Sequence, residues 1–315
     1  MAIPLDNRQI SNVVATTIDV RMKDLVDNHF NSNPLFVRLR TRGNIDSRGG
    51  EKIRRSFVYA GLGGGSYGKG DTFDTSYKEY QTDLLFDWKR NYAPLAIDGL
   101  DVAKNEGAHR VRDITNDMMD VAELTLADNI GGQIYGDGTG NASKDLDGLA
   151  IAVSTTGTYG GIARAATGPG NKNKGNVNST GGALSLSMIR SSIGDATIQP
   201  ERTDLIITTQ DLWDKLADRV DARQQTGEGN DMKKVGISAI NFDGADVVVD
   251  SHVASGEMWG LNTKYVEYWV LTGHDFQVRG LFDLHNEDGQ VGQIIVYSNL
   301  VVRAPRLQWR IQNIT

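Results

Sequence analysis

The sequence contains no cysteine, which excludes disulfides, thiolate metal ligands and cysteine nucleophiles. It also lacks long apolar runs: no stretch approaches the roughly 18 consecutive apolar residues that predict a membrane-spanning helix. The beginning, MAIPLDNRQ, has no apolar segment after a basic start, so the pattern of a signal peptide is missing. We therefore expect a chain that is made in the cytoplasm and makes no contact with a membrane.

An excess of positive charge is also lacking. The 33 basic and 40 acidic residues give a net charge of −7, which argues against a general nucleic-acid-binding protein. Residues 1 to 60 nevertheless carry a local charge of +4. We interpret this basic cluster as a solvated strand face, and the alternative is a surface for an anionic partner, either another protein or a packaged genome. Its members are Arg38, Arg40, Arg42, Arg48, Lys52, Arg54 and Arg55.

Motifs that carry catalysis or bind metals are missing as well. The five histidines are far apart in the sequence and fit no zinc-ligand spacing. The segment DGTGNASKDLDG at 137 to 148 begins like a calcium loop, but Gly148 stands where the closing glutamate belongs. No serine lies in a G-x-S-x-G elbow. We therefore expect no catalytic, metal-binding or cofactor-binding residues.

One stretch comes close to a nucleotide-binding motif. Residues 63 to 70 read GGGSYGKG, one residue short of the P-loop G-x-x-x-x-G-K-[ST], because Gly70 replaces the Ser or Thr whose hydroxyl binds Mg²⁺. A P-loop also follows a buried strand and opens a helix, whereas the segments on both sides here have the pattern of strands. We interpret the glycines as the tip of a hairpin. A P-loop-like nucleotide-binding enzyme is the alternative that rests on this motif alone.

The segments on either side of the glycines predict a long hairpin over about 50 to 92. KIRRSFVYA places apolar residues at alternate positions, and DTFDTSYKEYQ spaces aromatic residues among Thr, Ser and Asp, so we expect a strand in each. In LLFDWKR, Leu84, Phe86 and Trp88 share one side, which predicts that the base of the hairpin is anchored in a core. A long hairpin that is polar near its tip is not stable alone. The sequence therefore predicts that the tip needs a partner surface.

The remaining segments indicate an α+β chain. The first 33 residues have too few apolar residues for a core and predict an arm that rests on another surface. Residues 108 to 130 predict one long amphipathic helix, which YGDGTGN ends, and the chain closes with β-rich segments after an alternation of helices and strands. The apolar stripe of the long helix comprises Val111, Ile114, Met118, Val121, Ala122 and Thr125.

This order of segments resembles the major capsid proteins of tailed bacteriophages, with the Hong Kong 97 type of fold. The resemblance covers nearly the whole chain and includes short local matches. These are YGDGTGN with DLDGLA, TYGGIAR, DLIITTQDLWDKL, FDGADVVVDS, MWGLNTKYV and NLVVRAPRLQWRI.

The resemblance implies a division of the chain into an N-terminal arm, an extended E-loop, a peripheral domain with a spine helix, and an axial domain. The arm would be 1–48, the E-loop 49–93, the peripheral domain 94–183 (spine helix 108–130) completed by 272–315, and the axial domain 184–271. Inter-subunit contacts are expected from the E-loop residues Arg54, Arg55, Tyr67, Lys69, Asp71, Phe73 and Tyr77.

The implied function is that of a major capsid protein whose pentamers and hexamers form an icosahedral shell around a double-stranded DNA genome, contacted non-specifically. An encapsulin-type compartment for protein cargo is the alternative with the same fold. Separate portal and decoration proteins are possible partners. Because the arm starts almost at Met1, we expect a separate scaffolding protein or none; Lys69 is the candidate for a crosslink of the kind some members form, which we do not predict.

Overall fold

The computed structural model describes residues 33–73, 75–98, 108–219, 240–283 and 288–315, with side chains omitted for 108–117 and 281. These residues form two compact units. The first combines the described parts of Met1–Gly50, Trp88–Gly148 and Tyr268–Leu300, and the second those of Glu51–Asp87, Leu149–Glu267 and Val301–Thr315. Most of the predicted arm, residues 1–32, lies outside the described residues.

The first unit is built on a five-stranded sheet in which β14 is the longest strand. Its order is β1-β12-β14-β13, and β4 pairs with β14 along ten residues, from Lys89 opposite Ser298 to Asp98 opposite Gly289. Alternate residues of β4 are buried, among them Ala93, Leu95 and Ile97, as expected for a strand with one covered face. The strands are β1 (Ile45–Arg48), β4 (Lys89–Asp98), β12 (Val266–Leu271), β13 (Gln277–Asp283) and β14 (Gly289–Val302).

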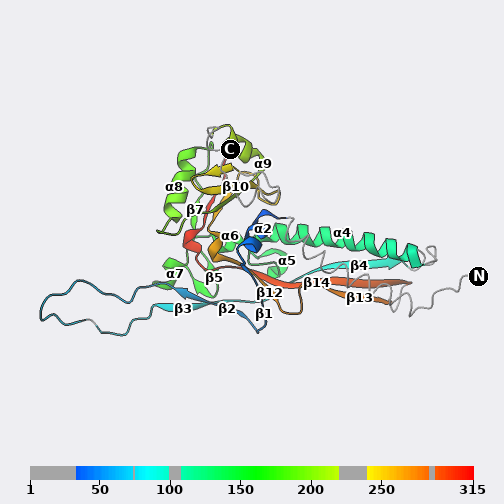
Figure 1. Cartoon of the computed structure of the whole chain (residues 1–315), viewed down its shortest axis with the longest axis horizontal. Helices are drawn as coiled ribbons and strands as arrows, with labels where there is room; N and C mark the ends of the chain where they lie inside the picture. Colours follow the sequence, from blue (N-terminus) through cyan, green and yellow to red (C-terminus); the bar gives the residue numbers. More distant parts are fainter. Residues whose placement is uncertain (1–32, 74, 99–107, 220–239, 284–287) are drawn as a thin grey trace, which may run out of the picture. The chain divides into compact units, whose positions relative to one another are not determined.

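The predicted long helix is confirmed as α4 (Ala108–Ile134), which packs on β4 (Figure 1). It continues four residues past the predicted end at 130, through Gly131 and Gly132, and stops before YGDGTGN. The buried face differs from the predicted stripe. Val121 and Thr125 are exposed and Met118 is half-buried. The helix is turned so that its core residues are Met119, Ala122, Leu126, Ile130 and Ile134.

Residues 34–41 form a helix that the sequence analysis did not predict, α2 (Pro34–Thr41). Asn33 caps it, because its side-chain oxygen accepts from the Leu35 N–H at 2.8 Å, and Pro34 occupies the first helical position. Leu35 and Phe36 are fully buried, and the Phe36 ring meets that of Tyr268 edge-on at 4.8 Å. Within the range predicted as an arm, α2 therefore packs in a core, and Ile45–Arg48 add strand β1 to the sheet of the first unit.

The second unit contains a six-stranded mixed sheet in the order β7-β15-β11-β8-β10-β9, together with two two-stranded sheets. Its strands are β2 (Ile53–Val58), β3 (Gln81–Phe86), β5 (Thr158–Tyr159), β6 (Ile162–Ala163), β7 (Asn176–Asn178), β8 (Leu205–Thr208), β9 (Ile240–Phe242), β10 (Ala245–Val249), β11 (Met258–Leu261) and β15 (Trp309–Ile311). Its helices are α6 (Leu149–Ala152), α7 (Pro169–Lys172), α8 (Leu186–Ala196), α9 (Gln210–Ala217), η1 (Thr263–Tyr265) and η2 (Pro305–Leu307); the short α5 (Gly140–Ser143) belongs to the first unit.

The core of the second unit lies where α8 and α9 pack on this sheet. Leu212 and Leu216 on α9 and Ile193 on α8 are buried in one hydrophobic cluster. Trp309 is fully buried, and its indole Nε1 donates to Thr203 Oγ1 at 2.9 Å. Across the parts of the chain that the structure describes, no helix combines the length and apolar character needed to cross a bilayer.

Candidate functional site

The root of the predicted hairpin is a regular antiparallel pair. Strand β2 pairs with β3 from Ile53 opposite Phe86 to Val58 opposite Gln81. Leu84 and Phe86 are buried, which confirms the prediction that the base of the hairpin is anchored in a core.

The loop around Gly160 holds this root. The Leu85 N–H donates to the Gly160 carbonyl at 3.0 Å, and the Phe86 ring meets that of Tyr159 at 5.0 Å. A Cβ on Gly160 would lie 2.7 Å from Leu84 Cδ2, which is closer than real Cβ atoms approach. Glycine at 160 therefore permits the close contact between this loop and β3.

A cluster of charged side chains around a buried glutamate also holds β2 in place. Arg55 binds Glu267 with both ends of its guanidinium, with Nε donating to Oε2 and Nη2 to Oε1, each at 2.6 Å. Arg303 Nε lies 2.8 Å from Glu267 Oε1, and the Glu267 side chain is only 5% exposed. One buried carboxylate thus lies between two guanidinium groups, and its two hydrogen bonds from Arg55 are of the strong, charge-assisted kind. Arg55, a predicted contact residue, is engaged within its own chain.

The other described basic residues near the root are paired with exposed acidic neighbours. Lys52 Nζ lies 3.0 Å from Asp87 Oδ1, and Arg54 Nε lies 3.6 Å from Asp83 Oδ2. These pairs fit the interpretation of the basic cluster as a solvated strand face. Arg38 is an exception, because it is buried in α2.

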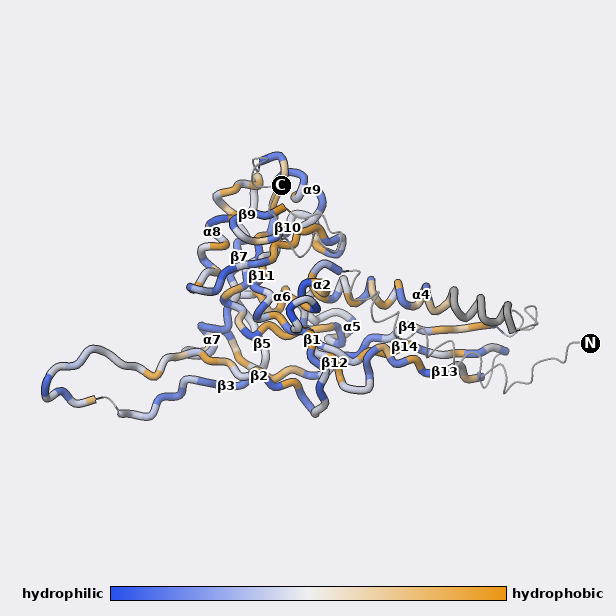
Figure 2. The backbone as a smooth tube through the Cα atoms, in the orientation of Figure 1, coloured by the Kyte–Doolittle hydropathy of each residue, from blue (hydrophilic) through white to orange (hydrophobic). Residues whose placement is uncertain are grey.

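Beyond the root, residues 59–80 leave the regular pairing. The Tyr59 N–H still donates to the Tyr80 carbonyl at 3.0 Å, but the described residues farther out form no strand. The predicted strand in DTFDTSYKEYQ is therefore wrong, because alternating aromatic residues stabilise a strand only where a partner strand supplies hydrogen bonds and cross-strand contacts. Figures 1 and 2 show this part as a long, mostly hydrophilic loop with a few isolated apolar positions.

The loop exposes large side chains that the described residues outside the loop do not cover. Tyr77 is 90% exposed and Tyr67 71%, although both are aromatic. Leu62, Phe73 and Tyr80 are also exposed. Exposed aromatic residues gathered on one segment are typical of interaction surfaces.

The glycine-rich motif forms a tight turn at the end of this loop. The Asp71 N–H donates to the Gly68 carbonyl at 3.3 Å, and Gly70, the third residue, has a φ of +95°. A glycine at that position is the signature of a type II turn. The Asp71 carboxylate also accepts from the Gly68 N–H. The described residues that follow Gly70 open no helix, so the motif lacks the helix N-terminus that a P-loop uses to hold phosphate.

The turn brings two aromatic side chains together. Tyr67 and Phe73 lie just outside it, and their rings meet edge-on with centroids 5.0 Å apart. Such pairs are favourable beyond the area that they bury. The tip therefore presents a preformed aromatic pair, which we call the aromatic knob, with Lys69 at the corner of the turn.

The structure divides the seven predicted contact residues into two groups. Arg54 and Arg55 lie at the root, whereas the other five lie in the loop beyond it. Sequence analysis missed Glu267, which lies 212 residues from its partner Arg55. It also missed Leu62, whose position in a hydrophilic loop was a usable signal. Among the described residues, no cluster of histidine and acidic side chains could hold a metal ion.

No protein-family model and no curated protein sequence matches this chain. Solved structures do match it along most of its length. A chain of the cyanophage A-1(L) capsid asymmetric unit has a TM-score of 0.67 at 16% identity, with 86% of this chain and 89% of that chain covered. A chain of the capsid of a native GTA particle has a TM-score of 0.64 at 8% identity, with 91% of each chain covered. A chain of the holo-SrpI encapsulin complex from Synechococcus elongatus PCC 7942 has a TM-score of 0.53 at 10% identity, with 90% and 88% covered. At these identities the likeness is one of fold.

Proposed function

Because the chain has the α+β, Hong Kong 97-type fold of tailed-phage major capsid proteins, as its sequence predicted, we propose that it is a major capsid protein. Its copies assemble into pentamers and hexamers in the host cytoplasm and form the icosahedral shell of a virion around double-stranded DNA. The role is structural, without a catalytic, metal or cofactor site. Scaffolding, portal and decoration proteins are possible further partners.

The observation that carries this proposal is the exposed loop at residues 59–80. Its aromatic residues have no cover within the structure, while its root is fixed by Arg55 and Glu267. A segment of this kind becomes stable when it docks on another surface. In a shell, identical heterologous contacts between neighbouring copies supply that surface for every subunit. We assign these contacts to Arg54, Tyr67, Lys69, Asp71, Phe73 and Tyr77.

We propose that the segments have the roles in the shell, and the residue ranges, that the resemblance implies. The arm at 1–48 reaches a neighbouring subunit through the residues that precede α2, and 49–93 extend over the adjacent subunit as the E-loop. The peripheral domain is 94–183 with 272–315, and 184–271 surround the five- and six-fold axes. The basic residues of 1–60 that remain exposed supply non-specific contacts to neighbours or to the genome.

The state of association of the purified protein tests the proposal. We expect pentamers, hexamers or closed particles in electron micrographs and in sedimentation, with scaffold added where it is required. A strictly monomeric protein at high concentration in the presence of scaffold would contradict the proposal.

A compartment for protein cargo is the second candidate, and the likeness to the SrpI encapsulin complex favours it. The contents of particles from the native source separate the two functions. A phage shell contains nucleic acid and has a portal at one vertex, whereas an encapsulin contains protein cargo. The nucleotide-binding alternative predicts Mg²⁺-dependent ATP binding that Lys69→Ala abolishes. We expect no such binding by calorimetry.

A further inference from the structure

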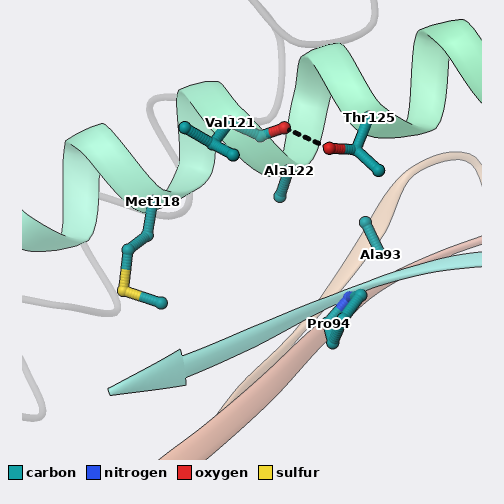
Figure 3. A pocket seen from close by; sticks show the side chains of 6 residues that line it. All are labelled: Ala93, Pro94, Met118, Val121, Ala122 and Thr125. Atoms are coloured by element: carbon teal, nitrogen blue, oxygen red, sulfur yellow. Dashed lines mark hydrogen bonds between the residues drawn. The ribbon is translucent and has the colours of Figure 1, made fainter. Parts of the chain in front are cut away.

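An apolar groove lies between α4 and β4 in the first unit (Figure 3). Its volume is about 340 Å³. Small side chains on the strand and on the facing side of the helix leave the hollow open, and Val121 on its rim is 64% exposed. The lining residues are Ala93, Pro94, Met118, Val121, Ala122 and Thr125.

The described lining of the groove is almost entirely apolar. Among these described residues Thr125 alone has a polar side chain, and its hydroxyl already donates to the Val121 carbonyl one turn earlier at 2.8 Å (Figure 3). An apolar hollow of this kind favours an apolar occupant, because covering Val121 and Met118 removes their surface from water.

The aromatic knob at the hairpin tip fits the groove in size. An apolar cavity of about 150 Å³ holds one benzene molecule, so the groove has room for the two rings of Tyr67 and Phe73. The turn at Gly68–Asp71 already holds these rings together. Because the knob is preformed, docking requires little additional ordering of its side chains.

The charges near the knob and near the groove also favour docking of the knob in the groove. Lys69 lies at the corner of the turn, between the two aromatic residues in the chain. From Met118 to Ile134 the sequence of α4 contains three acidic residues and no Lys or Arg. Asp128 follows Val121 by seven residues and is exposed on the same side of the helix as the groove rim. A knob that enters the groove can therefore bring Lys69 toward Asp128.

We propose that the groove between α4 and β4 receives the Tyr67–Phe73 knob of a second copy of this chain, with the Phe73 ring inside and the Tyr67 hydroxyl at the rim. The inference rests on the proposed function and specifies its contact. Each copy carries one knob and one groove, so the contact is heterologous and repeats around a ring until it closes. A partner of another kind would leave either the knob or the groove of each copy uncovered.

Because the sequence contains no cysteine, two cysteines introduced by substitution are the only ones that can form a disulfide. Disulfide formation therefore tests the proposed contact directly. One chain carries Phe73→Cys and a second, with a tag that changes its size, carries Val121→Cys. After co-assembly and mild oxidation we expect a disulfide between the two chains in most subunits, because the Cβ atoms of a disulfide must come within about 4.5 Å. The control pairs Phe73→Cys with Asp211→Cys on α9, which is also exposed, and should give little product.

Three outcomes are distinguishable. If the cysteine-free parent forms no pentamers, hexamers or particles, the proposed function fails and this inference fails with it. If the parent assembles but the Phe73–Val121 pair gives no more product than the control, the inference alone is overturned. If one chain with both cysteines forms only an internal disulfide, the groove receives the hairpin of its own chain and the second copy is the wrong occupant.

The effect on assembly of a substitution at the groove rim is an independent test of the proposal. Val121→Asp should weaken assembly by roughly tenfold or more, as at an interface hot spot. Leu124→Asp is the matched control, because Leu124 is 71% exposed on the same helix but does not line the groove. Both variants should fold, since both side chains are exposed. Equal assembly of the two variants would contradict the proposal.

Discussion

Arg55 and Glu267 form a two-point ion pair, with both nitrogen–oxygen distances at 2.6 Å, that joins the hairpin root to the start of β12. The Glu267 side chain is 5% exposed and that of Arg55 24%. The neighbouring residue Arg54 has a looser pair with Asp83 at 3.6 Å, with side-chain exposures of 72% and 42%. Two adjacent arginines therefore differ in what they contribute to the stability of the subunit.

We expect Arg55→Met to lower the free energy of unfolding by about 2–4 kcal/mol, because it leaves the buried carboxylate of Glu267 with one partner fewer. Arg54→Met should change the free energy by less than about 1 kcal/mol, since exposed pairs contribute little. Urea unfolding of the dissociated subunit, monitored by circular dichroism, measures both. Equal effects of the two substitutions would show that the Glu267 cluster does not fix the root.

The glycine-rich tip differs from the root of the hairpin, because all of residues 61–70 are exposed and none of them packs in a core. Deleting Gly61 to Gly70 shortens an exposed loop, and loop length has a small effect on stability. We expect the subunit to keep its thermal transition and to lose the capacity to form stable particles. Scanning calorimetry of the subunit and electron microscopy of the assembly reaction give the two readouts. Loss of subunit folding would mean that the tip belongs to the core.

Local patterns in the sequence predicted the elements whose residues interact within a short segment. The long helix, predicted for 108–130, followed from its three- and four-residue spacing, and the anchored root followed from Leu84 and Phe86. Helix α2 also has a local signal, because Asn33 followed by Pro34 is a standard start of a helix. The strand at 71–81 was wrong because propensity cannot show whether a partner strand is present.

The rest of the candidate site depends on contacts between distant residues. Nothing in the sequence connects Arg55 with Glu267, and a carboxylate at any of many positions could have been the partner. The groove depends on how α4 is turned over β4. The apolar stripe of the helix includes the groove residues Met118 and Val121, but periodicity alone does not separate core residues from residues that line a hollow.

Arg164 is a buried cation that the sequence analysis did not single out. Its guanidinium donates to the carbonyls of Asn173 at 2.7 Å, Thr156 at 2.9 Å, Ile151 at 2.8 Å and Ala152 at 2.7 Å. Burial lowers the pKa of Arg164 from its ordinary value. The side chain thus joins three segments of the loop region between residues 151 and 173.

Arg164→Lys should destabilise the second unit by about 2–4 kcal/mol, because a single ammonium group cannot replace the planar fork and leaves buried carbonyls without donors. Arg202→Lys is the matched control, since the Arg202 and Asp243 side chains are 51% and 44% exposed. Limited proteolysis followed by mass spectrometry should detect new cleavage between residues 151 and 173 in Arg164→Lys only. An unchanged protease pattern together with wild-type stability would show that the four hydrogen bonds are dispensable.

Alanine substitutions at the adjacent residues Gly160 and Gly161 separate the effect of backbone strain from the effect of steric overlap. Both have a positive φ, +57° and +79°, so an alanine at either position incurs the left-handed strain of about 1 kcal/mol. At 160 the added methyl also meets Leu84 and Phe86, whereas at 161 nothing lies within 4 Å. We expect Gly160→Ala to be more destabilising than Gly161→Ala by at least about 1 kcal/mol, as overpacking requires.

Because Leu84 lies on β3, Gly160→Ala should also accelerate amide hydrogen exchange at Leu85, which donates to the Gly160 carbonyl. Equal destabilisation by the two alanines, with Leu85 exchange unchanged, would mean that the loop at 160 can move away from β3 without loss.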